Sequence, residues 1–450
     1  MLTPSRSTEG CVMHVVVCGA GPVGAVVALL LAAGGHQVTV LDQRPVPPPS
    51  ADPGTRGQLP TVSDRLRATR EPPLLMLPGA MRMVSRELPG IARKLASAST
   101  VIEGGTDLVA HRTVVSSMLS EELSRTRGVR TERGVGVAAL LTTGTERIPG
   151  RPHIQGVLTD TGKAVLADLV VDAAGRESRM VRLLSEVGAP RPHEERQDTG
   201  FRFYTRHFGS AETSAGRARW SLHHFDGVSV GVLSAGHGQW SMTLCIGDED
   251  LELYLLAGPS AWNRAAGLYA PLLPRLGGSP LPGVWVTSRL ESCYRRFVLR
   301  GRPVATGTAS VGDAWAATNP LLGLGPSMGL LHAVLLRDAV RQGGPEEVAV
   351  RFDRLTEDLL APLHHRITEW EEGLQAGDGW FSDRPGSRRG LPGAAAVSGA
   401  PPGPDTKPAG LARDLLARFS AVAADAASST RTGPSRAQLV ETLARSGTGV

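Results

Sequence analysis

The sequence is poor in cysteine and in long apolar runs. Its four cysteines, Cys11, Cys18, Cys245 and Cys293, are widely scattered and include no CxxC pair. This pattern argues against both a disulfide framework and a zinc site. The longest dense apolar stretch is residues 25–33, about half of the roughly 20 residues that a membrane helix needs. We therefore expect no membrane span.

Charge of one sign is also scarce. The formal net charge is +5, and most of the basic excess is dispersed over residues 382–450 without an aromatic stacking platform, so no nucleic-acid partner is expected. The pairs His223–His224 and His364–His365 are poor metal ligands, because neighbouring residues of a strand or helix diverge. We expect no metal site. The polar start of the chain lacks a signal-peptide pattern, which favours a cytoplasmic protein.

What the chain does have is length and enough apolar material for a large core. Its 450 residues, of which 41% are hydrophobic, allow one large α/β domain or two to three ordinary ones. A β-branched run at 14–18 predicts a buried strand, residues 22–33 predict a helix, and 37–41 predict a second strand. Together these segments predict a β-α-β unit.

Later segments predict a sheet and further helices. From residue 200 to residue 245 the sequence alternates as in antiparallel strands, with Phe203 and Thr205 on one face and Tyr204 on the other. Proline and glycine crowd residues 385–410, which predicts a flexible linker. Other expected elements are helices at 76–97 and 114–126, strands at 154–159, 164–173 and 304–311, helices at 326–340 and 346–374, and short helices at 411–427 and 437–444.

A glycine motif joins the first predicted strand to the first helix. Gly19 permits a tight turn, Gly21 lets the backbone approach a pyrophosphate, and Gly24 allows close packing of helix and strand. An anion bound there would lie at the helix N-terminus, where N–H groups are unpaired. Asp42 closes the second strand, where a carboxylate accepts hydrogen bonds from ribose hydroxyls. The motif predicts a nucleotide site but does not distinguish NAD from FAD.

A second motif decides between these cofactors. Residues 311–325, VGDAWAATNPLLGLG, resemble the second flavin motif of the flavoprotein aromatic hydroxylase superfamily. The resemblance implies FAD, with Asp313 holding its ribityl chain and Pro320, Gly323 and Gly325 passing close to the isoalloxazine ring. A helix that starts just after Gly325 would direct its N–H groups at the flavin and stabilise the reduced anion.

A third motif bears on how the flavin is reduced. Residues 170–178, VVDAAGRES, resemble the middle motif of the same superfamily, but Ala174 stands where many NAD(P)H-using members have aspartate, and the carboxylate is Asp172 instead. Reduction by NAD(P)H directly or through a separate flavin reductase therefore both stay open. Arg112 matches a family arginine near the FAD pyrophosphate.

The resemblance implies an α/β fold: a Rossmann-like FAD-binding domain with an inserted, mostly antiparallel β-sheet substrate domain and a helical C-terminal part. The runs at 200–206 and 294–297 are similar to those of bacterial epoxidases of the squalene-epoxidase type. The expected division is an FAD-binding domain at 11–189 and 300–345, a substrate-binding sheet at 190–299, C-terminal helices at 346–380, and a flexible linker and tail at 381–450.

The implied activity is that of a monooxygenase. It would use O2 to hydroxylate or epoxidise an organic small molecule through a flavin C4a-hydroperoxide, as in natural-product tailoring such as antibiotic biosynthesis. The flavin carries the chemistry, so few catalytic side chains are required. Candidates for lining the substrate pocket, each of which has ordinary packing as its alternative, are Tyr204, Arg206, Trp220, His224, Trp240 and Trp315.

Three alternative functions are compatible with a flavin-binding chain. A flavin-dependent halogenase is disfavoured, because none of the seven tryptophans forms a WxW pair and the first lysine, Lys94, lies in a helical stretch. A reductase of the prenyl-reductase type stays open, since the Asp172 variant also occurs there. An FAD-binding protein without turnover also stays open, because Ala174 and Ala316 replace polar residues common in hydroxylases, and oxygen-dependent product formation would exclude it.

Overall fold

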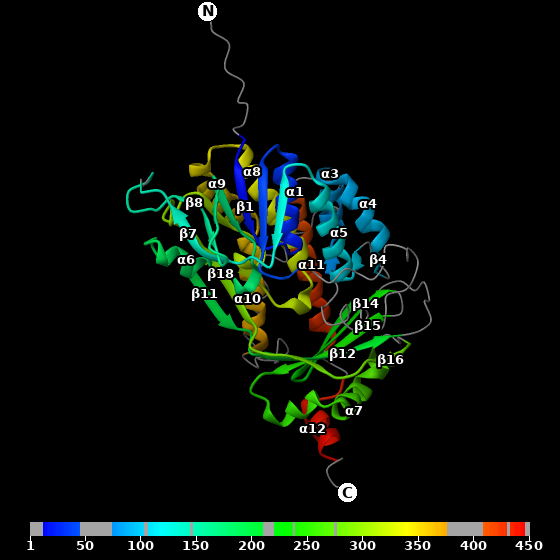
Figure 1. Cartoon of the computed structure of the whole chain (residues 1–450). Helices are drawn as coiled ribbons and strands as arrows, with labels where there is room; N and C mark the ends of the chain where they lie inside the picture. Colours follow the sequence, from blue (N-terminus) through cyan, green and yellow to red (C-terminus); the bar gives the residue numbers. More distant parts are fainter. Residues whose placement is uncertain are drawn as a thin grey trace, which may run out of the picture.

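A parallel sheet and an antiparallel sheet dominate the structure and face each other (Figure 1). The computed structural model describes residues 12–45, 74–102, 107–144, 147–209, 220–236, 239–273, 277–375, 408–429 and 433–445, and the account below concerns these residues. No helix in this part of the chain is long and apolar enough to cross a membrane.

The parallel sheet has five strands in the order β21-β10-β1-β2-β6. Its strands are β1 (His14–Cys18), β2 (Gln37–Asp42), β6 (Val129–Arg133), β10 (Leu169–Asp172) and β21 (Thr308–Ser310). β1 lies between β2 and β10, with Cys18 opposite Leu41 and Asp172. The buried β-branched run of β1 fits a strand that is covered on both faces. The carboxyl ends of these strands therefore meet at one edge, where α/β folds bind ligands.

Helices cover the parallel sheet and close its core. The first is α1 (Pro22–Ala33), which starts with proline and ends at Gly34 and Gly35, the latter with φ +89°. It packs against α5 and α8. The other helices of this half are α3 (Pro78–Glu87), α4 (Pro89–Ala98), α5 (Arg112–Arg125), α6 (Met180–Glu186), α8 (Gly325–Arg341), α9 (Pro345–Leu359) and α10 (Ala361–Gln375).

A six-stranded antiparallel sheet, which we call the roof sheet, lies below the parallel sheet in Figure 1. Its strands are β12 (Phe201–Gly209), β13 (Trp220–Phe225), β14 (Val228–Gly236), β15 (Gln239–Gly247), β16 (Ser279–Pro280) and β17 (Trp285–Thr287). One face packs on α7 (Pro259–Tyr269) and the short 3-10 helix η2 (Leu251–Ala257), which gives this half its own core around Trp262 and Leu244. The other face looks toward the parallel sheet.

Four smaller sheets complete the described part of the fold. Their strands are β3 (Leu74–Met76), β4 (Thr100–Val101), β5 (Leu108–Ala110), β7 (Val137–Thr142), β8 (Ile154–Thr159), β9 (Ala164–Leu166), β11 (His193–Asp198), β18 (Glu291–Arg296), β19 (Val298–Leu299), β20 (Arg302–Pro303) and β22 (Ala316–Ala317). The chain enters the roof half through β11 and leaves it through β18, and these two strands pair antiparallel.

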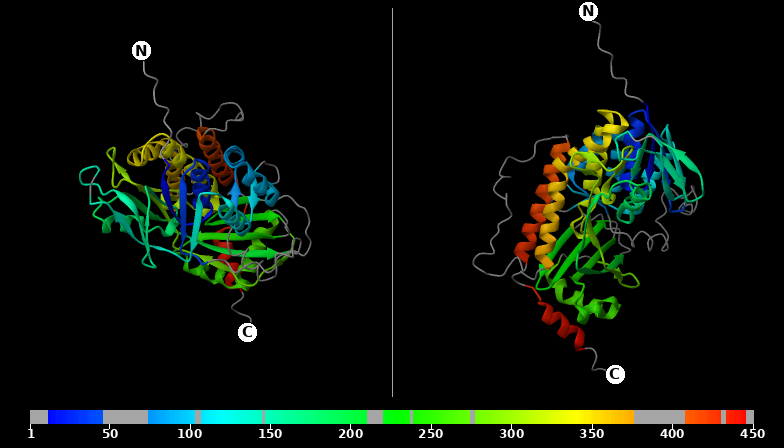
Figure 2. Two further views of the ribbon diagram at one scale, coloured as in Figure 1. Left: turned by 45° about the horizontal axis from the view of Figure 1, so that its top comes forward. Right: turned by 90° about the vertical axis from the view of Figure 1, so that its left-hand side faces the viewer.

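Both short helices expected near the end of the chain are present, but they pack on the rest of the molecule and do not form the flexible tail that was also expected. α11 (Pro408–Ser429) packs on α3, α8, α10 and β13, while α12 (Arg436–Ala444) packs on α7, and Figure 2 shows α11 beside α10. Asp414 pairs with Arg82 at 2.7 Å, and Arg436 pairs with Asp250 at 2.5 Å. Apolar faces on both helices supply the burial that composition alone did not reveal. Most of the expected linker, residues 385–407, lies outside the described residues.

Candidate functional site

A cavity of about 850 Å³ lies between the carboxyl ends of the parallel strands and the roof sheet. Its lining includes Gly19, Asp42 and Asp313 from the upper half and Thr205 and Trp220 from the roof sheet. The volume is typical of cofactor and substrate sites. The cavity therefore unites the predicted nucleotide site and the predicted substrate domain.

The glycine turn after β1 has the geometry that its motif predicts. A Cβ on Gly24 would lie 2.0 Å from the carbonyl oxygen of Gly19, and a Cβ on Gly19, with φ +114°, would lie 2.5 Å from the carbonyl oxygen of Ala173. A Cβ on Gly21 would meet nothing within 4 Å. α1 begins at this point without a side-chain cap, so its first N–H groups face the cavity and are available to an anion.

Asp42 ends β2 at the cavity wall and is 3% exposed. Its Oδ1 accepts from the backbone N–H of Arg44 at 3.0 Å, and its Oδ2 pairs with Arg44 at 3.0 Å and with Arg133 at 3.2 Å. Burial alone would raise the pKa of Asp42, but the Arg44 hydrogen bonds and the two guanidinium charges outweigh it and lower the pKa. This strand end is where a ribose hydroxyl would meet an ionised carboxylate, and both oxygens of Asp42 are already in contact with Arg44 or Arg133.

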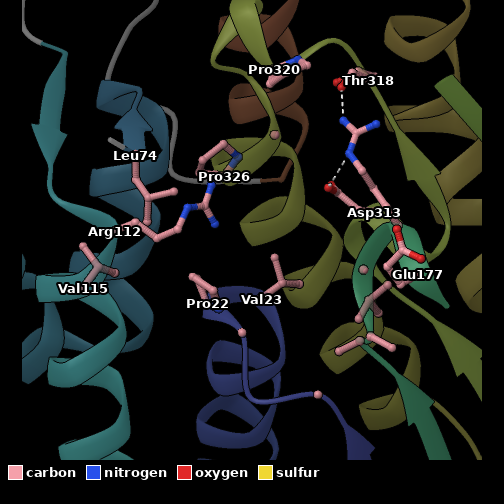
Figure 3. A pocket seen from close by; sticks show the side chains of 18 of the residues that line it. Pro22, Val23, Leu74, Arg112, Val115, Glu177, Asp313, Thr318, Pro320 and Pro326 are labelled. Carbon is pink, nitrogen blue, oxygen red and sulfur yellow. Dashed lines mark hydrogen bonds and ion pairs between the residues drawn. The ribbon is translucent and has the colours of Figure 1, made fainter. Parts of the chain in front are cut away.

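Asp313 lies across the cavity from Arg112, on opposite sides of the start of α1 (Figure 3). It sits in the 3-10 turn η4 (Gly312–Ala314) and keeps 44% of its side chain exposed, so its carboxylate faces the cavity. Burial raises the pKa of Asp313, and the charges of Arg176 and Arg112 oppose the rise. Its carboxylate pairs with Arg176, whose Nε is 3.6 Å from Oδ2.

The loop that follows is held from two sides. Arg176 donates to the carbonyl of Thr318, as the upper dashed line in Figure 3 shows, and the buried Glu371 of α10 accepts from the N–H of Asn319 at 3.2 Å. This places Pro320, Gly323 and Gly325 in the cavity wall. Gly323 has φ +66°, and a Cβ there would press on Leu75 at 2.9 Å. α8 starts at Gly325 without a side-chain cap, so a second helix N-terminus borders the cavity.

Asp172 lies in the wall but uses its carboxylate within the protein. It is 2% exposed and accepts from Ser178 Oγ at 2.5 Å, Ala174 N at 3.1 Å and Ser310 Oγ at 3.3 Å. Burial raises the pKa of this carboxyl, and the three hydrogen bonds oppose the rise. Asp172 therefore shapes the turn η1 (Gly175–Glu177), from which Arg176 extends, rather than presenting a free acceptor to a cofactor.

These residues fit a dinucleotide with a flavin end. The space at Gly21 and the uncapped start of α1 suit a pyrophosphate, Asp42 suits the adenosine ribose, and Asp313 suits the hydroxyls of a ribityl chain. The glycines of the second motif leave room for a flat ring at the start of α8. When bound, FAD supplies the redox and oxygen chemistry, and the protein supplies position and electrostatics.

The roof sheet presents alternate residues of β12 to the cavity. Phe203, Thr205 and His207 line it, whereas Tyr204 lies on the opposite face among the α7 core residues. Thr205 Oγ1 is 2.8 Å from Thr243 Oγ1 on β15. One cross-strand row runs Trp285, Thr205, Thr243, Gly231, Leu222. Four strand spacings of about 4.8 Å make this row about 19 Å wide, with hydroxyls and a glycine at its centre and apolar ends.

Five of the six predicted pocket residues are elsewhere, and only Trp220 of that group lines the cavity. Tyr204 and Arg206 point toward α7, where Arg206 donates to Asn263. Trp240 stacks on Phe208 at 3.8 Å. The other two contact buried aromatic rings: His224 lies against Trp370, and Trp315 lies against His332. The alternation was predicted correctly, but the face that meets the cavity was not.

Several lining residues were missed. Arg176 stands within the quoted middle motif, and its long charged side chain next to the glycine was an available signal. Thr205, His207 and Thr243 belong to the predicted antiparallel strands, but nothing local marks them as cavity residues. Burial lowers the pKa of His207 to about 4, so its imidazole is neutral at ordinary pH.

Comparisons with known proteins agree with this architecture. No protein-family model matches the chain. Protein Rv3254 of Mycobacterium tuberculosis is 26% identical over 381 residues, which is 78% of each chain. PqsL of Pseudomonas aeruginosa, described as a probable FAD-dependent monooxygenase, has a TM-score of 0.57 at 16% identity, covering 82% of this chain and 98% of its own.

Two other solved structures have the same fold. One is 2-methyl-3-hydroxypyridine-5-carboxylic acid oxygenase, with a TM-score of 0.57 at 14% identity over 82% of this chain and 94% of its own. The other is the tetracycline destructase Tet(55), with a TM-score of 0.54 at 13% identity over 93% of this chain and 98% of its own. The chain therefore has the fold of the FAD-dependent monooxygenases of the aromatic hydroxylase type.

Proposed function

We propose that this protein is an FAD-dependent monooxygenase that hydroxylates or epoxidises an organic small molecule, in natural-product tailoring. The observation that carries the proposal is the shared cavity: Gly21, Asp42 and Asp313 meet there at the edge of the parallel sheet, directly across from the roof sheet. A cofactor held by the upper residues would have its ring facing a substrate held by the lower ones.

The lining supports a small organic substrate. The roof face combines Phe203, Trp220 and Trp285 with the hydroxyls of Thr205 and Thr243, which is the mixture of apolar walls and few polar groups that small-molecule sites use. The structural relative PqsL has been solved with 2-aminobenzoylacetate, at a TM-score of 0.55 and 17% identity.

The route of reduction is part of the proposal. The carboxylate of Asp172 accepts hydrogen bonds from Ser178, Ser310 and the N–H of Ala174, and Ala174 itself has no carboxylate. We therefore favour a separate flavin reductase, or reduction that waits for the substrate, over rapid direct reduction by NADPH.

The test is the visible spectrum of the FAD-loaded protein under anaerobic conditions, before and after NADPH is added. We expect a flavin spectrum that stays oxidised for minutes without substrate. Bleaching within seconds would contradict the reduction route. Failure of the purified protein to bind FAD at all would contradict the function.

Product formation is tested separately with a flavin reductase and a panel of aromatic and polycyclic compounds. The expected product carries one atom from ¹⁸O2. A product that gains two hydrogens in the absence of oxygen would identify a reductase instead, and FAD binding with no product from any compound would favour a carrier without turnover.

A further inference from the structure

The turn that carries Asp313 is fixed by a buried histidine. Gly312, the first residue of η4, has φ +60°, and its N–H points away from the cavity into the core. There it donates to Nδ1 of His332, which lies on α8, at 3.1 Å. His332 is 1% exposed. The backbone immediately before Asp313 therefore depends on one side-chain acceptor.

The opposite ring nitrogen fixes the tautomer of His332. Nε2 lies 3.1 Å from Oγ1 of Thr356 on α9, and that hydroxyl donates its only hydrogen to the carbonyl of Phe352 at 2.7 Å. Thr356 Oγ1 must then accept from Nε2–H, so Nδ1 keeps its lone pair for Gly312. The ring also stacks on Phe352 at 4.5 Å and meets Trp315 edge-on at 4.7 Å.

Protonation does not compete with this role. Burial lowers the pKa of His332 to about 3, so Nδ1 remains an acceptor at ordinary pH. The far end of the turn has its own support, because Arg295, 1% exposed, donates to the carbonyl of Ala314 at 2.8 Å. Between these two attachments the Asp313 carboxylate alone is directed into the cavity.

We infer that His332 is a positioning residue for the cofactor: held by Thr356, it accepts from Gly312 N–H and thereby aims Asp313 at the ribityl chain of FAD. The inference rests on the proposed function, because it needs FAD as the ligand of Asp313. It connects the helical layer of α8 and α9 to the cofactor although His332 itself touches no part of the cavity around Asp42 or Arg112.

The test measures FAD affinity by quenching of flavin fluorescence in protein from which FAD has been removed. His332→Phe keeps a ring of similar size but removes the acceptor, and we expect FAD to bind about tenfold or more weakly, as for one buried hydrogen bond. His332→Asn keeps a side-chain acceptor near the Nδ1 position and should recover part of the loss. Thr356→Val removes the acceptor that holds the proton of His332 on Nε2, and we expect it to weaken FAD binding by a smaller factor than His332→Phe.

A matched control separates aiming from general stability. His224→Phe replaces another buried histidine, 4% exposed and bonded to Ser229 at 2.7 Å, that is not in the cavity lining. We expect it to lower the melting temperature without weakening FAD binding. If His332→Phe does not fold, His332→Asn and Thr356→Val carry the test, with the visible circular dichroism of bound flavin as the second readout.

The outcomes are distinct. Wild-type protein that binds no FAD overturns the proposed function. Wild-type protein that binds FAD, with affinity and flavin spectrum unchanged in the His332 and Thr356 variants or changed no more than in His224→Phe, overturns the inference alone.

Discussion

The two halves that face the cavity are specified in different ways. In the half that contains the parallel sheet, which we call the cofactor half, the site is formed by backbone geometry. Gly19 and Gly24 bring main chains together, and α1 and α8 begin at the cavity without side-chain caps. In the roof half, side chains make the site, and the strand backbone would be the same with other residues at Thr205 or Thr243. A site formed by backbone geometry tolerates few residue types at its key positions, whereas a site formed by side chains on a sheet tolerates many.

The largest expected effect tests the backbone half. Gly24→Ala should prevent folding or cost about 3 kcal/mol or more of unfolding free energy, because its Cβ would lie 2.0 Å from the Gly19 carbonyl oxygen, which is backbone and cannot move aside. Gly21→Ala should fold normally, because its Cβ meets nothing within 4 Å, but should weaken FAD binding by filling the pyrophosphate space. Chemical denaturation of both variants, with FAD titration of the second, checks this.

Equal stability of Gly24→Ala and Gly21→Ala would show that close packing does not define this half. Unchanged FAD affinity in Gly21→Ala would show that the pyrophosphate does not bind beside Gly21.

The next effect concerns Asp313, the carboxylate of the second flavin motif that lines the cavity. Asp313→Ala should weaken FAD binding by roughly 10- to 150-fold, as expected for a lost hydrogen bond to a charged group. Glu177→Ala, an exposed carboxylate in the same lining, is the matched control and should stay within about twofold. Flavin occupancy after purification is the measurement. Full occupancy in Asp313→Ala would show that Asp313 does not bind FAD.

The features that could be predicted from the sequence belong mainly to the half that contains the parallel sheet. The glycine turn, Asp42 and the second flavin motif lie within short segments whose chemistry is local, and the structure places all of them in one cavity wall. Which face of β12 meets the cavity depends on where α7 packs, and α7 is more than fifty residues downstream. The alternation puts Tyr204 and Arg206 on one face of β12 and Thr205 on the other, but it does not indicate which face meets the cavity; in the structure Tyr204 and Arg206 face α7.

A third experiment tests whether the roof face selects the substrate. Thr243→Phe places a ring at the centre of the cavity row and should lower kcat/KM by about tenfold or more for compounds that the wild type accepts, with FAD affinity within about twofold. Tyr204→Phe, on the far face, should leave both unchanged. If Tyr204→Phe alters the range of accepted compounds and Thr243→Phe does not, the assigned faces are reversed.

The smallest effect is in the pH dependence of stability. Burial lowers the pKa of His207 and of His224 to about 4, below the value near 6.5 in the unfolded chain. The unfolded state therefore binds more protons between pH 6.5 and 4, and the unfolding free energy falls as the pH is lowered through that window, by at most about 1.4 kcal/mol per pH unit for each histidine.

Replacing either histidine by glutamine should flatten this slope, and less so for His207, whose ring borders the cavity. Denaturation curves at pH 5, 6 and 7 supply the measurement. Slopes parallel to the wild type in both variants would mean that neither ring is held neutral by the fold.

The position of α11 near the end of the chain has a consequence for the order in which the site forms during synthesis. The guanidinium of Arg418 lies 4.7 Å from the ring of Trp220 and pairs with Asp107 at 3.3 Å, while Asp414 holds Arg82. Because the ribosome makes the chain from its N-terminus, Trp220 is synthesised nearly two hundred residues before the side chain that packs on it. The packing against Trp220 is thus completed late, and a nascent chain that ends before residue 408 lacks the Arg418 contact with this ring.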